Sequence, residues 1–209
     1  MVSRVRPASD FDRIASKVAI WHGYDSAVKA ELYSTCLARS DGKYLIDPFP
    51  LQSEALEELV GSSRVAGIIV TSSNHHRASA QFAKRLSAPI FARSETFPNT
   101  TSREFTRVAD GDEICDELKV IGIEGAAPGE LVLHYAPNSG TLVVGDALIN
   151  FEPYGFTFLP GKYCSNEKEM RRSLRKLLDY KAERILFAHG TPILSGASNR
   201  LRDLLDSNL

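Results

Sequence analysis

The amino-acid sequence predicts a layered α/β protein in which β-sheets lie between helices. Two observations support this class. Strand-like apolar runs alternate with helix-like segments along the chain. One such run, residues 68–70, has a predicted helix on each side in the sequence, which indicates a strand parallel to its neighbour and covered on its faces. The 209 residues, 43% of them hydrophobic, suffice for one sizeable core, so we expect a single domain over residues 1–209.

The first half of the chain begins with strands. Residues 18–21 form one predicted strand, and residues 31–38 and 43–47 form two more. The pair Asp41-Gly42 between the latter two is typical of a hairpin turn. A helix capped by Ser53 is then predicted over residues 53–60, with its apolar positions on one face.

The rest of the chain continues this alternation. Residues 151–163, rich in Phe, Tyr, Pro and Gly, are predicted to form a loop that either walls a pocket or fills the core. The further predicted strands are residues 118–123, 131–135, 141–144 and 185–188. Residues 88–92 form a short apolar run, and further helices are expected from near Ser79, over 166–180 and over 198–205.

Polar side chains directly follow four of the predicted strands. The ends of strands in a covered sheet gather at one rim, where binding clefts form. A further carboxylate stands in a loop of small residues, which lets the backbone approach closely. The candidate site residues are therefore Asp47, His75, His76, Asp146 and His189, with Glu130 from the loop.

Each candidate also has an ordinary structural explanation. Asp47 precedes a proline and could be a turn carboxylate. Adjacent side chains rarely face one target, so we expect at most one of His75 and His76 to point inward. Asp146 could cap a turn, but its place behind a valine run favours a functional role.

Composition excludes several classes of partner. A formal net charge of −1 argues against broad binding to nucleic acid or anionic lipid. No apolar run approaches the roughly 20 residues that cross a bilayer, and the first residues do not form a secretory signal. The three cysteines form no CxxC pattern, so we expect a cytoplasmic protein with reduced thiols.

In their order along the chain, these features resemble the metallo-β-lactamase superfamily over nearly the whole length. The features are the hairpin ending in Asp47, the strand-turn-helix from Thr71, the Pro-Gly-Glu130 loop, Gly-Asp146 and His189-Gly. The resemblance implies a four-layer αβ/βα sandwich. It also implies kinship with zinc- or iron-dependent hydrolases, nucleases and redox enzymes.

The metal-binding motif of that family is only partly retained. Aligned without gaps on Thr71, its Thr-His-x-His-x-Asp-His motif places Ser72 and Asn74 on the first two histidines. His76 and Arg77 then fall on the aspartate and the third histidine, whereas a slip of one residue would bring in His75. Glu130 stands at the Pro-Gly-His histidine, and the resemblance implies that Asp47 supports the site.

The resemblance therefore implies one metal position at most. Ser72 and Asn74 are poor zinc ligands, so they are expected to support the site rather than hold an ion. His76, Asp146 and His189 could hold a single Zn or Fe ion. The alternative is a metal-free pocket in which Arg77 pairs with a carboxylate where a cation would sit.

Two functions follow as the main hypotheses. The first is a hydrolase that activates water with one metal ion and cleaves an ester, lactone, thioester or phosphoester. Glu130 or His75 would move the proton, and Arg77 would stabilise an oxyanion or an anionic substrate. The second is a metal-free module that binds a small anion at Arg77, or nothing. A nuclease role is disfavoured by the net charge.

Overall fold

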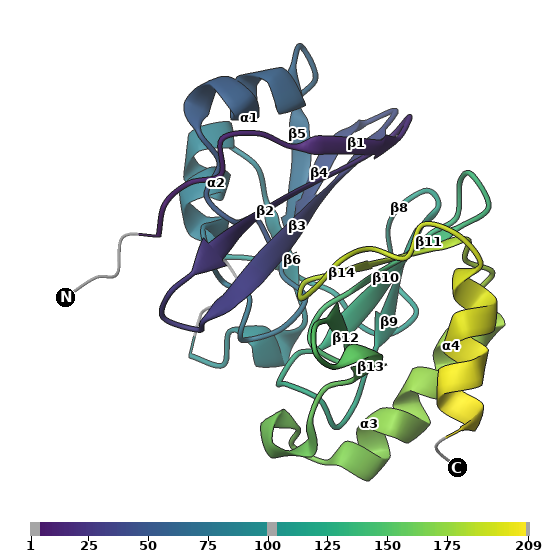
Figure 1. The fold of residues 1–209 in the computed structure, drawn as a ribbon. Helices are drawn as coiled ribbons and strands as arrows, with labels where there is room; N and C mark the ends of the chain where they lie inside the picture. The colour runs from purple at the N-terminus through teal and green to yellow at the C-terminus, as the bar shows by residue number, and fades with distance from the viewer. Residues whose placement is uncertain (1–4, 100–103, 208–209) are drawn as a thin grey trace. The chain divides into compact units, whose positions relative to one another are not determined.

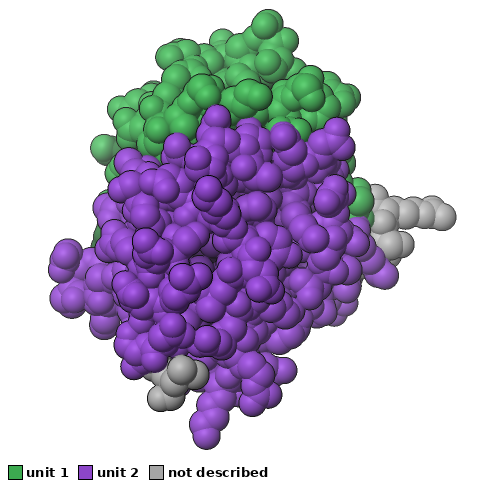
Figure 2. Space-filling model, turned by 90° about the vertical axis from the view of Figure 1, so that its right-hand side faces the viewer, with its two compact units in different colours: residues 1–70, 75–91, 100–106 green, residues 71–74, 92–99, 107–209 purple. Residues whose placement is uncertain are grey.

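A computed structural model describes residues 5–99 and 104–207. The chain divides into two compact units, coloured separately in Figure 2. Unit 1 comprises residues 1–70, 75–91 and 100–106, and unit 2 comprises residues 71–74, 92–99 and 107–209. The predicted α/β class is confirmed, because helices and sheets alternate along the chain (Figure 1).

Most of the first sheet belongs to unit 1. Its order, β1 to β7, follows the sequence. The predicted hairpin is confirmed, since β3 and β4 pair antiparallel with Arg39 opposite Gly42. The covered parallel strand is also confirmed: β5 pairs parallel with β4 and β6, and Ile68 and Ile69 are fully buried. The strands are β1 (Asp12–Ala15), β2 (Val18–Asp25), β3 (Ala30–Arg39), β4 (Gly42–Ile46), β5 (Val65–Ile69), β6 (Ile90–Ala92) and β7 (Thr106–Arg107).

Two helices cover one side of the unit 1 sheet, as Figure 1 shows. They are α1 (Ser53–Val60) and α2 (Ser79–Leu86). Leu56 of α1 and Phe82 of α2 share one apolar cluster with Ile68 of the sheet. The predicted cap at Ser53 is wrong: Gln52 is the N-cap residue of α1, and its side chain makes no capping hydrogen bond.

The second sheet lies in unit 2 and has the order β14-β11-β10-β9-β8. Only its edge pair β11 and β14 is parallel, with Val144 opposite Phe187. Because parallel strands end at the same edge, the residues after Val144 and Phe187 emerge side by side. The strands are β8 (Glu113–Cys115), β9 (Leu118–Gly122), β10 (Leu131–Tyr135), β11 (Thr141–Val144) and β14 (Arg184–Phe187).

The segment predicted as a loop, residues 151–163, is partly a hairpin. Strands β12 (Leu148–Phe151) and β13 (Gly155–Phe158) pair antiparallel. Gly155 has φ of +63°, a conformation that glycine adopts without steric cost, and it helps the chain to turn back. Phe158 then joins the apolar cluster of unit 2, so packing orders a sequence rich in turn residues.

Helices α3 (Glu167–Leu174) and α4 (Ala197–Asp206) pack on the unit 2 sheet. The single helix predicted over residues 166–180 tightens into a 3-10 helix, η3 (Arg175–Asp179). Met170, Leu174 and Leu177 on one side of this segment are fully buried. Two short 3-10 helices, η1 (Ser94–Thr96) and η2 (Gly161–Tyr163), complete the elements described. Within the described residues, no helix has the length and apolar character needed to cross a membrane.

Candidate functional site

The parallel edge of the unit 2 sheet brings an aspartate and a histidine together. Asp146 follows β11 by two residues and His189 follows β14 by two residues. His189 Nε2 lies 3.2 Å from Asp146 Oδ1. Asp146 is buried, while the side chain of His189 keeps 19% of its surface exposed. This pair can therefore face a ligand that enters from solvent.

The loop of residues 71–74 holds the other oxygen of Asp146. Two backbone hydrogen bonds tie this loop down, from Leu131 N to the Thr71 carbonyl (2.8 Å) and from Ser73 N to the Pro128 carbonyl (2.9 Å). The loop then presents two donors to Oδ2 of Asp146. They are the hydroxyl of Ser72 at 3.2 Å and the side-chain amide of Asn74 at 2.8 Å.

Glu130 is fully buried and fixes the turn that carries Asp146. Its Oε1 accepts a hydrogen bond from the backbone N–H of Ala147 at 3.0 Å. Gly145 is needed at this point, because a Cβ there would lie 2.8 Å from Glu130 Oε1 and 2.6 Å from Thr71 Oγ1. Ala147 was not singled out from the sequence, whereas the glycine directly before the aspartate was, and its close approach to Glu130 and Thr71 explains why glycine stands there.

The pKa of the Cys164 thiol depends on burial and on the charged groups of this region. Burial is the main cause that raises the pKa of Cys164, and the carboxylate of Glu167 raises it further. Glu130 and Asp146 contribute weaker shifts in the same direction. Because only the thiolate is a good nucleophile or metal ligand, Cys164 is disfavoured in both roles at neutral pH.

Unit 1 holds the remaining candidates. His75 Nδ1 lies 2.9 Å from Asp47 Oδ2, and both residues are 2% exposed. Arg77 donates from Nη1 to the backbone carbonyls of Tyr33 and Asp47. His76 is exposed. Only one of the adjacent histidines is thus buried, in agreement with the expectation that they do not share one target.

Among the described residues of unit 2, Asp146 and His189 offer two metal-ligating side chains in close proximity. Of the two adjacent histidines of unit 1, His75 rather than His76 is buried and held by a carboxylate. Imidazole and carboxylate groups are donor types that suit a Zn or Fe ion.

The matches to known proteins agree with this architecture. The sequence model of the metallo-β-lactamase superfamily matches residues 14–208. A search of curated proteins finds no match to the chain. Among solved structures, the DIM-1 metallo-β-lactamase superposes with a TM-score of 0.75 at 13% identity, over 99% of this chain and 100% of that one.

Two further solved structures are similar. A metallo-β-lactamase from Hirschia baltica has a TM-score of 0.71 at 14% identity, over 96% of this chain and 97% of that one. A metallo-β-lactamase family protein from Thermus thermophilus has a TM-score of 0.68 at 18% identity, over 94% of this chain and 80% of that one. Identities this low establish the fold alone. The predicted sandwich of the metallo-β-lactamase type is confirmed.

Proposed function

We propose a hydrolytic function from one premise: the chain belongs to the metallo-β-lactamase superfamily. The proposed reaction is the hydrolysis of a small-molecule ester, lactone, thioester or phosphoester with the help of at most one metal ion. One observation carries this proposal, namely the contact within unit 2 that places His189 Nε2 3.2 Å from Asp146 Oδ1. The net charge of −1 favours a small substrate over a nucleic acid.

His75 replaces His76 as the proposed ligand. Histidines that bind metals usually engage a carboxylate through their second ring nitrogen, which fixes the orientation of the ring. Asp47 occupies that position, with Oδ2 2.9 Å from Nδ1 of His75. Nε2 of His75 is then the nitrogen that would bind the metal. A bound Zn or Fe ion would lower the pKa of a water molecule at the site.

The surroundings of Asp146 support a single metal position. Ser72 and Asn74 donate to Oδ2 and leave Oδ1 directed toward His189. Hydroxyl and amide groups are weak ligands for zinc. These two residues therefore orient the carboxylate and do not build a second metal position.

Glu130 and Arg77 are best assigned positioning roles within this proposal. One carboxylate oxygen of Glu130 accepts from Ala147 N, which holds the turn before the next strand. Arg77 holds the carbonyl of Asp47, whose side chain contacts His75. Both residues would thus act through Asp146 or His75 and not on the reacting atoms.

A metal-free binding module is the second candidate. It is favoured by the contacts of Asp146, since Ser72, Asn74 and His189 engage both of its carboxylate oxygens. A protonated His189 would neutralise the charge of Asp146 in that state.

Metal content distinguishes the two candidates. The protein is produced with added zinc and iron, and bound metal is measured by inductively coupled plasma mass spectrometry. The hydrolase proposal predicts about one equivalent, lost in His189→Ala and in Asp146→Asn. His134→Ala changes a histidine that is not a proposed ligand. It is the matched control and should retain the metal.

A very low metal content would favour the other candidate. Less than about a tenth of an equivalent in a protein whose circular dichroism shows normal folding would overturn the hydrolase proposal. The metal-free module would then be the better description of this chain.

A further inference from the structure

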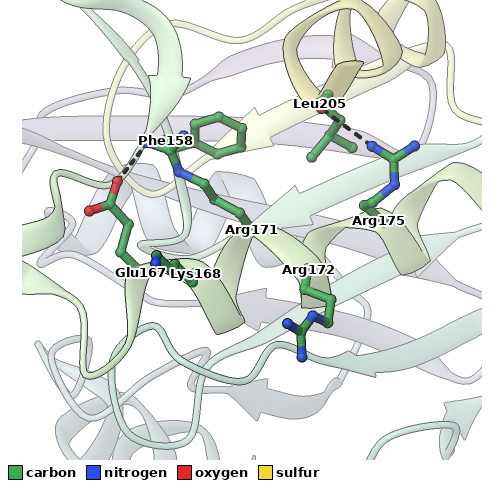
Figure 3. Close-up of a pocket in the computed structure, with 7 residues that line it drawn as sticks. All are labelled: Phe158, Glu167, Lys168, Arg171, Arg172, Arg175 and Leu205. Atoms are coloured by element: carbon green, nitrogen blue, oxygen red, sulfur yellow. Dashed lines mark hydrogen bonds and ion pairs between the residues drawn. The ribbon is translucent and has the colours of Figure 1, made fainter. Parts of the chain in front are cut away.

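A cavity of about 510 Å³ opens on unit 2. Neither Asp146 nor His189 lines it. Its size falls within the range of pockets that hold small molecules. Figure 3 shows its lining, which comes from β13, α3, η3 and α4.

The helical side of this cavity is strongly cationic. Lys168, Arg171, Arg172 and Arg175 have the spacing i, i+3, i+4 and i+7, which places them on one face of α3 and its 3-10 extension. Glu167 is the acidic lining residue, so the formal charge of the lining is +3. Like charges at this spacing repel one another, and a bound anion would remove that repulsion.

Two of the four cations are held in place by neighbours. Arg171 pairs with Glu167 at 2.6 Å, and its guanidinium lies 4.7 Å from the centre of the Phe158 ring. Arg175 pairs with Asp206 at 3.0 Å and donates to the Leu205 carbonyl at 3.3 Å. These contacts orient planar guanidinium groups beside the apolar surfaces of Phe158 and Leu205 (Figure 3).

The cavity retains unused capacity to bind an anion. The side chains of Lys168 and Arg172 are exposed and form no hydrogen bond or ion pair with any residue that the structure describes. Arg172 extends away from the guanidinium groups of Arg171 and Arg175 in Figure 3, so its long side chain can rotate. In addition, Nε of Arg171 is buried without a hydrogen-bond partner in the described part of the chain, a condition that an acceptor would relieve.

We propose that this cavity binds a small organic phosphate, in which the anionic group contacts the cationic helix face and a compact apolar group contacts Phe158 and Leu205. Guanidinium groups match the geometry of phosphate oxygens and form strong, charge-assisted hydrogen bonds with them. A phosphate monoester carries about −1.5 to −2 charge at neutral pH, which complements the cationic lining. This site goes beyond the proposed hydrolase function and does not depend on it.

The test is a calorimetric titration of the full chain with phenyl phosphate at constant ionic strength. The parent protein is expected to bind about one equivalent saturably, and Lys168→Gln/Arg172→Gln is expected to weaken binding by about tenfold or more. The side chains of these two residues contact no hydrogen-bond or ion-pair partner among the described residues, so the fold should be preserved. Lys84→Gln/Arg202→Gln is the control with the same charge change at exposed positions and should bind as the parent does.

Further titrations distinguish this proposal from binding at the other site and from binding of an inorganic anion. Asp146→Asn should bind phenyl phosphate normally, and loss of binding there would overturn the proposal by placing the ligand at the other site. Pyrophosphate that binds more tightly than phenyl phosphate would overturn the assignment of an organic ligand in favour of a free inorganic anion. Absence of saturable binding, or equal binding by the Lys168→Gln/Arg172→Gln variant, would also refute it.

Discussion

At the scale of single residues, the choice of His75 as a proposed metal ligand rests on how it differs from His76. The two side chains are adjacent in sequence, yet one is 2% exposed and the other is exposed to solvent. The contact between His75 and Asp47 joins residues 28 positions apart. A partner so distant in sequence is invisible to local patterns, so the sequence analysis could name both histidines but not choose between them.

Replacing each histidine by alanine tests this difference directly. His75→Ala is expected to abolish metal binding, because it removes one of three proposed ligands, whereas His76→Ala should keep the metal content of the parent. Metal content by mass spectrometry, measured on both variants in parallel, is the readout. Retention of metal by His75→Ala together with its loss in His76→Ala would restore the gap-free alignment of the motif.

Removing the charge of Asp47 tests its proposed supporting role. Asp47→Asn keeps the size of the side chain but weakens its hold on His75 Nδ1, so metal affinity should fall by about 10–100-fold. Competition with a chromophoric chelator measures that affinity. Asp41→Asn, at the hairpin turn, provides a control with the same change of charge and should leave affinity within about twofold. Equal affinities in all three proteins would contradict the role given to Asp47.

At the scale of elements, the sequence predicts some helices and strands well and others poorly. The sequence analysis located the start of α2 and both ends of β10 and β11 within a residue, because apolar periodicity marks such segments. It missed the hairpin of β12 and β13, since glycine, proline and aromatic residues close together are also typical of loops. It misplaced the cap of α1, where a serine stood one residue inside the helix.

The two helix starts offer a matched pair for measurement. Asn166 caps α3 by accepting a hydrogen bond from Glu169 N at 3.2 Å, whereas Gln52 at the start of α1 makes no such bond. Asn166→Ala is therefore expected to lower the free energy of unfolding by about 0.5–2 kcal/mol. Gln52→Ala should change it by less than about 0.5 kcal/mol. Urea denaturation followed by circular dichroism measures both, and equal effects would contradict the assigned caps.

At the scale of the whole molecule, residues 5–99 and 104–207 contain two apolar clusters. One includes Leu56 and lies in unit 1, and the other includes Leu174 and lies in unit 2. The prediction of one domain over residues 1–209 is thus a statement about cooperativity: both clusters should melt together.

Cavity-forming substitutions in each cluster test that prediction. Leu56→Ala and Leu174→Ala should each destabilise the protein by about 2–5 kcal/mol, because both side chains are fully or almost fully buried. In a single domain, each variant shifts one common transition in urea, monitored by circular dichroism and by Trp21 fluorescence. Two separate transitions, of which each variant moves only one, would show two independently folding domains.

The sequence by itself determined the α/β class, most of the strands and helices, and the polar residues that follow the strands, because these depend on short-range periodicity and turn chemistry. Only the tertiary structure decided that His189 meets Asp146, that Ser72 and Asn74 hold the same carboxylate, and that Arg171 is fixed beside Phe158. Those contacts depend on strand register and side-chain direction between segments far apart in the chain. No local run of residues specifies such geometry.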